Sequence, residues 1–102
     1  MLEIYQKLKS QILMLKGLQA KYNKHYISFV RDRNVVDVKI QQKSIKIWIN
    51  LNIGELNDPK GLSKDVSKIG HLGNGDYEIT ITSLNQIDDI MDLIHQSYDF
   101  KP

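Results

Sequence analysis

A strict alternation of apolar and polar residues in the first half of the chain constrains its fold more than any other feature. Three alternating runs cover residues 26–30, 36–40 and 45–51, and polar turns at 31–34 and 41–43 separate them. A period of two places every second side chain on the same face of a strand, so these runs indicate a sheet that is buried on one side. Because the connections are short, neighbouring strands must be antiparallel. The sequence therefore predicts a three-stranded meander.

Further elements flank this meander on both sides. Apolar residues that recur at about 100° per residue predict a first helix over residues 2–22. The alternating segment 77–82 predicts a fourth strand. A last helix is predicted to begin near Ser83 or Asn85, because these side chains cap the free amides of a helix start. The apolar stripe of that helix consists of Ile87, Ile90, Met91, Ile94 and Tyr98.

The segment between the third and fourth predicted strands is rich in turn residues. Pro59 ends the extended region, because proline has no amide hydrogen to donate. Residues 60–69 predict a short helix with Leu62, Val66 and Ile69 facing inward, and residues 70–76 predict a loop. The expected fold is a single α+β domain over residues 1–102 with the order α-β-β-β-α(short)-β-α. A four-stranded antiparallel sheet would carry two long helices packed on one face.

Size and composition exclude several classes of protein. The chain has 102 residues, which suits one domain with a modest core. It has no cysteine, which excludes a disulfide scaffold and a thiolate metal site. No apolar run approaches the roughly 18 residues of a membrane span, and the N-terminus lacks a signal-sequence pattern. We therefore expect a cytoplasmic protein with no membrane partner and no cofactor.

The net charge of +2 conceals a difference between the two halves of the chain. Residues 1–50 carry ten Lys and Arg against three acidic residues, whereas residues 51–102 carry four Lys against nine acidic residues. If the fold keeps the halves apart, the domain has one basic side that would attract polyanions. If the halves interleave, their charges neutralise one another.

Two motifs carry a resemblance to a known family. They are Asn57-Asp58-Pro59-Lys60-Gly61 and Gly73-Asn74-Gly75-Asp76, supported by the ending that runs from Met91 to Tyr98. On these residues, over nearly the whole chain, the sequence resembles a small bacterial domain of unknown function. That domain is found alone, in so-called predicted transport proteins, and at the C-terminus of GmrSD-type modification-dependent restriction proteins. The resemblance implies an accessory role in DNA restriction or defence, and it supplies no catalytic residues.

The polar face of the predicted sheet is the leading candidate for a binding surface. Alternation places Trp48 there, flanked by Lys46 and near Lys39, and the turn with Arg31 and Arg33 lies close by. An aromatic ring that stacks on bases, surrounded by cations, is typical of single-stranded nucleic-acid binding. DNA or RNA is therefore one expected partner of these five residues. The same face could instead pack against another protein.

A protein-interaction or dimerisation module is the alternative function. Leu13 and Met14 lie off the apolar stripe of the first predicted helix. A second apolar patch on a terminal helix favours contact with another surface, either a restriction-type protein or a second copy of the chain.

No residue set predicts an enzyme. The loop with Gly73, Asn74 and Gly75 could bind a ligand through its amides, but its glycines equally serve a tight turn, and it does not match a phosphate-binding fingerprint. Asp58 and Asp65, with nearby lysines, have the composition of a Mg²⁺ site, although Asp58 before Pro59 is typical of a turn. The three histidines lack metal-ligand spacing. We expect no catalytic and no metal-binding residues.

Overall fold

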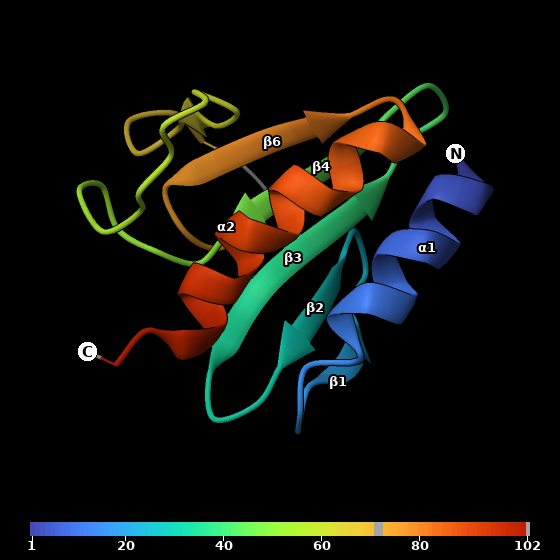
Figure 1. Ribbon diagram of the computed structural model, residues 1–102, viewed down its shortest axis with the longest axis horizontal. Coiled ribbons are helices and arrows are strands. Elements are labelled where there is room, and N and C mark those ends of the chain that lie inside the picture. Colours follow the sequence, from blue (N-terminus) through green and yellow to red (C-terminus); the bar gives the residue numbers. More distant parts are fainter. Residues whose placement is uncertain (71–72, 102) are drawn as a thin grey trace.

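The computed structural model describes residues 1–70 and 73–101 and has an α+β fold. Two helices, α1 (Leu2–Ile12) and α2 (Ile87–Asp99), cover the same face of an antiparallel sheet (Figure 1). The sheet has six strands in the order β1-β2-β3-β4-β6-β5. They are β1 (Gln19–Tyr22), β2 (Ile27–Val30), β3 (Asn34–Ile40), β4 (Ile45–Ile49), β5 (Lys64–Asp65) and β6 (Tyr77–Ile81). The predicted fold class is confirmed, and the prediction of four strands is wrong.

The meander forms as the alternation predicts. Phe29, Val36 and Ile49 lie opposite one another across β2, β3 and β4, and all three side chains are fully buried. The next strand in the sheet is β6, which places Ile79 opposite Ile47. These apolar side chains form one core with the buried faces of α1 and α2.

The first helix is shorter than predicted, because the chain turns after Ile12 and pairs with the sheet. The amides of Met14 and Leu15 bond to carbonyls three residues earlier, which tightens the end of α1. Gly17 then adopts a φ of +85°, a conformation that favours glycine. Residues 19–22 form β1 and satisfy the outer edge of β2. The apolar residues of this segment fit both the helical and the strand period, and pairing with β2 makes the segment a strand.

The predicted helix over residues 60–69 is also wrong. The carboxylate of Asp58 accepts bonds from the backbone amides of Leu62 and Ser63, at 3.0 and 2.8 Å, and so builds a turn. β5 follows and pairs with β6. Val66 is buried as predicted, whereas Ile69 is exposed.

The predicted start of the last helix is confirmed at Ser83. Ser83 and Gln86 form a capping box at the short 3₁₀ helix η1 (Leu84–Gln86), which leads directly into α2. At the other end of α2, Ser97 Oγ donates to the carbonyl of Val35 at 2.7 Å and fixes the helix on β3. Across the described residues, neither helix has the length and apolar character that crossing a membrane requires.

Candidate nucleic-acid interface

The sheet face opposite the helices, which we call the back face, carries Trp48, and the structure buries this side chain. Trp48 is 3% exposed. A Cβ placed on Gly73 would lie 2.5 Å from the ring of Trp48, so the chain at Gly73 lies directly against the indole. The prediction of Trp48 as an exposed stacking platform is therefore wrong. Alternation identified its face correctly but could not indicate that a distant loop covers it.

Asp37 holds that loop in place. It lies opposite Trp48 on the neighbouring strand and is fully buried. Its carboxylate accepts bonds from the amide and the side chain of Asn74, at 2.6 and 3.0 Å, and from Asn34 Nδ2 at 2.7 Å. The amide of Asn74, which we considered for ligand binding, thus bonds within the domain. The contacts favour a structural role for Gly73, Asn74 and Gly75.

Lys39 and Lys46 lie side by side on the back face. They are opposite each other across β3 and β4. Lys46 donates to Thr80 Oγ1 at 2.7 Å and forms an ion pair with Glu78 at 3.8 Å. Lys39 forms no ion pair with any described residue. Glu78 partly offsets the charge of Lys46, whereas no described carboxylate pairs with Lys39, so Lys39 is the stronger candidate for contact with an anion.

A shallow hollow lies beside Lys39, between the end of β3 and the β1–β2 turn. It has a volume of about 180 Å³, and Lys24, His25, Tyr26 and Lys39 line it together with Asn23, Ile27, Val38 and Ile40. We define the basic cluster as Lys24, His25, Tyr26, Lys39 and Lys46. Alternation along the strands does not indicate Lys24 or His25, because both lie in a turn. The pairing of β1 with β2 would have indicated them, since it makes residues 23–26 a hairpin turn beside Lys39.

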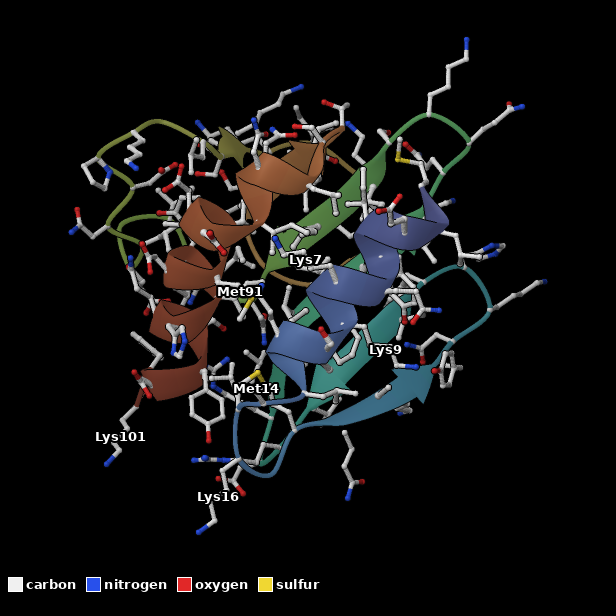
Figure 2. All side chains as sticks on the ribbon, turned by 45° about the vertical axis from the view of Figure 1, so that its right-hand side comes forward. Lys7, Lys9, Met14, Lys16, Met91 and Lys101 are labelled. Carbon is white, nitrogen blue, oxygen red and sulfur yellow. The ribbon has the colours of Figure 1, made fainter. Side chains whose placement is uncertain are left out.

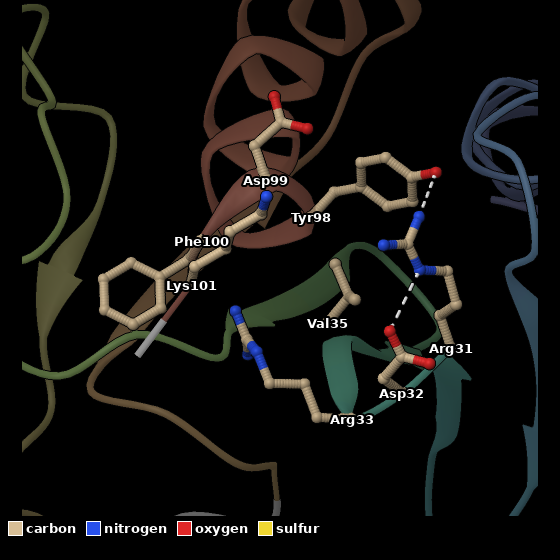
Figure 3. Close-up of a pocket in the computed structure, with 8 residues that line it drawn as sticks. All are labelled: Arg31, Asp32, Arg33, Val35, Tyr98, Asp99, Phe100 and Lys101. Carbon is tan, nitrogen blue, oxygen red and sulfur yellow. Dashed lines mark hydrogen bonds and ion pairs between the residues drawn. The ribbon is translucent and has the colours of Figure 1, made fainter.

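Arg31 and Arg33 are in a different place, at the opposite end of β3. Arg33 donates to the carbonyls of Asn34, Asn50 and Ser97, at 3.0, 3.2 and 2.6 Å, and so ties the β2–β3 turn to the end of α2. Arg31 donates to Tyr98 Oη at 2.7 Å. Figure 3 shows both arginines beside the end of α2. The structure thus divides the five predicted nucleic-acid residues among three locations.

The strand order separates the charges of the two halves. The basic half supplies β1 to β4, and the acidic half supplies β6 and β5 at the other side of the sheet. The halves therefore lie side by side and the sheet does not interleave them. Within the sheet, the cluster therefore lies among the basic strands, while α2 of the acidic half packs on the other face of β3 and β4.

Asp58 and Asp65 each serve a local turn. Asp58 Oδ2 accepts from Ser63 Oγ at 2.5 Å, and Asp65 Oδ1 accepts from Ser67 Oγ at 2.6 Å. Burial acts to raise the pKa of Asp58, but the hydrogen bonds from Ser63, Leu62 and Gly61 outweigh it and lower this pKa. Within residues 1–70 and 73–101, no group of three or more His, Cys, Asp or Glu could hold a metal ion.

Acid is expected to weaken the turn that Asp58 builds. A carboxyl whose folded pKa is depressed stabilises the fold above its unfolded pKa and loses that contribution as the pH falls through the folded pKa. Urea unfolding at several pH values between about 6 and about 2.5 should therefore show a larger loss of stability in the wild type than in Asp58→Asn. Equal losses in both proteins would contradict this assignment. Asp32→Asn, which alters an exposed carboxylate, is the control.

Comparisons with known proteins give a family and no activity. A family model described as "Domain of unknown function (DUF5655)" matches residues 1–101. An uncharacterized protein of Haemophilus influenzae is 53% identical over 96 residues. The match covers 93% of this chain but 32% of that relative, so the chain spans about a third of the length of the curated relative. No solved structure gives a significant match.

Proposed function

The chain belongs to the DUF5655 family of unknown function, and we propose that it is a non-catalytic accessory domain that binds nucleic acid through its basic cluster. The observation that carries this proposal is the Lys39–Lys46 pair, opposite each other on the back face, beside the hollow lined by Lys24 and His25. Lys46 bonds to Thr80 and Glu78 on β6, whereas Lys39 forms no ion pair with any described residue. A phosphate of a nucleic-acid backbone would pair with Lys39 and compete with Glu78 for Lys46.

The form of the cluster suits an extended polyanion. Its lysines lie on one turn and two strands, and the hollow beside Lys39 is shallow, so a nucleic-acid strand could lie across the surface. Tyr26 lines the hollow and is half-buried. Its ring takes the place of the covered Trp48 as the aromatic surface on which a base could stack. Lysine contacts to phosphate would give affinity without sequence preference.

The relation to a longer protein supports an accessory role. The match covers 32% of the Haemophilus influenzae relative, so the matching part lies there within a longer chain. A nucleic-acid surface would hold such a protein on its target while another segment acts. The resemblance to the C-terminal domain of GmrSD-type restriction proteins supports a role in DNA restriction or defence.

Binding to labelled oligonucleotides tests the proposal. Trp48 is buried, so fluorescence anisotropy of a dye on a short single strand and on a short duplex is the appropriate measurement. The double variant Lys39→Ala/Lys46→Ala should bind on the order of tenfold more weakly at low salt. The matched control Lys7→Ala/Lys60→Ala removes two exposed lysines on the helix side of the sheet, one on α1 and one that pairs with Asp89 of α2, and should bind as the wild type does. Equal affinities for all three proteins would overturn the proposal.

Exposed apolar residues favour a second candidate, a protein-interaction or dimerisation module. Met14 is 82% exposed and Leu13 is 40% exposed. Figure 2 shows Met14 just past the end of α1, on the side that approaches α2. If this patch mediates dimerisation, light scattering should show a mass that rises with concentration in the wild type and remains monomeric in Leu13→Ser/Met14→Ser. A monomer at every concentration would contradict dimerisation.

A further inference from the structure

A groove at the end of α2 holds two arginines and is distinct from the basic cluster. It has a volume of about 540 Å³, within the range of small-molecule sites. Figure 3 shows Arg31 and Arg33 on either side of Val35, with Tyr98 and Phe100 along the rim. The groove thus combines two guanidinium groups with an apolar floor and two aromatic rings.

The guanidinium of Arg33 is fixed before any ligand arrives. Its three hydrogen bonds all go to backbone carbonyls, and its carbon lies 5.5 Å from the ring centroid of Phe100. It forms no ion pair with any described residue. Carbonyls position the group without cancelling its charge, and two of its five N–H donors have no acceptor among residues 1–70 and 73–101.

Arg31 is held by Tyr98 and only loosely by a carboxylate. Its guanidinium carbon lies 4.7 Å from the Tyr98 ring centroid, and Tyr98 Oη in turn donates to the carbonyl of Lys16 at 2.6 Å. The ion pair with Asp32 spans 3.6 Å, and the Asp32 side chain is 89% exposed. An anion with better geometry could therefore replace Asp32.

Other charges nearby leave the groove open to an anion. Figure 3 shows the carboxylate of Asp99 directed away from the two guanidiniums. Figure 2 shows Lys16 and Lys101 extending at this same end of the molecule. Cations therefore outnumber carboxylates around the entrance.

We propose that this groove binds a phosphate monoester attached to a planar ring, such as a mononucleotide or the 5′-phosphorylated end of a strand. A carboxylate presents its oxygens in one plane, which a single arginine satisfies. Two guanidiniums on opposite sides of Val35 instead suit the tetrahedral oxygens of a dianionic phosphate. The outer face of the half-buried Phe100 ring would contact the base. This site goes beyond the proposed function and uses none of the basic cluster.

Titrations followed by amide NMR test this site. AMP should shift the amides of Asn34 and Phe100, whereas adenosine should leave them unchanged. A dinucleotide with and without a 5′-phosphate distinguishes the two sources of the phosphate. Shifts with AMP alone identify a free nucleotide, and equal shifts with the phosphorylated dinucleotide identify a strand end. The proposal would be overturned if adenosine and AMP produced the same amide shifts, or if AMP produced no shifts at any concentration.

Two variants separate this site from the basic cluster. Arg31→Gln should bind AMP about tenfold more weakly, because it loses a charge-assisted contact. Lys39→Ala/Lys46→Ala should bind AMP as the wild type does. Arg31 does not tie the backbone elements together as Arg33 does, and circular dichroism verifies that the variant folds. Unchanged AMP binding in Arg31→Gln, or amide shifts produced by a glutamate-rich peptide but not by AMP, would refute the site.

Discussion

Gly75→Ala is expected to lower the free energy of unfolding by about 2–5 kcal/mol, from backbone strain plus steric overlap. Gly75 has a φ of +92°, in the region that disfavours residues with a Cβ. A Cβ there would also overlap the carbonyl oxygen of Ile49 and the backbone of Asn50. The substitution must therefore push the loop away from the end of β4. Urea unfolding followed by circular dichroism measures the effect.

Gly54 provides a matched control for this prediction. Its φ is +93°, nearly that of Gly75, but nothing lies within 4 Å of an added Cβ. Gly54→Ala should therefore show only the backbone strain, about 1–2 kcal/mol. If both substitutions destabilise the protein equally, close packing of the loop against β4 contributes nothing to stability.

Asp37→Ala is expected to destabilise the domain by about 2–4 kcal/mol and to uncover Trp48. The substitution removes the carboxylate that accepts from Asn34 and from both donors of Asn74, and it leaves a cavity where the fully buried Asp37 side chain lay. The loop would then lose its attachment to β3, and Gly73 would no longer hold its place over the indole.

Trp48 reports this release directly. In the wild type its emission should be blue-shifted and poorly quenched by acrylamide, because the ring is buried. In folded Asp37→Ala the emission should shift to the red and quenching should increase. Asp32→Ala removes an exposed carboxylate and should change neither property. Lower stability without a change in the Trp48 signal would show that Asp37 stabilises the sheet but does not hold the loop.

The predictions that the structure confirms concern features that residues close together in the sequence determine. Strict alternation with short turns defined β2, β3 and β4, and helical spacing after Ser83 defined α2. The prediction of a helix up to Tyr22 was wrong because the apolar residues of its last part fit both the helical and the strand period. The period alone could not reveal that β2 had an unpaired edge for β1 to satisfy. The turn at Asp58 depends on one side chain bonding to two amides, which composition does not show.

The arrangement of the candidate site depends on contacts between residues that are far apart in the sequence. The pleat of β4 placed Trp48 opposite the helices, but only the folded chain shows Gly73 covering it. Arg33 was predicted to contact nucleic acid, and the sequence did not indicate that it also bonds to three carbonyls, one of them 64 residues away. Lys39 and Lys46 lie opposite each other because they belong to paired strands. The short turn between the two strands made this pairing predictable.

The family assignment and its suggested contexts have different support. The match over residues 1–101 confirms membership in a domain family of unknown function. The links to restriction and to predicted transport proteins remain predictions. A nucleic-acid surface on the back face would support the first link.

The salt dependence of nucleic-acid binding tests the central claim most directly. Anisotropy titrations of a labelled single strand and a labelled duplex, from about 50 to about 200 mM salt, give the slope of log K against log salt. If Lys39 and Lys46 each contact one phosphate, the double variant should lose about 1.4 units of slope on the single strand and about 1.8 on the duplex. Lys7→Ala/Lys60→Ala should retain the wild-type slope. A slope near zero in the wild type, or the same slope in both double variants, would contradict a nucleic-acid surface at the basic cluster.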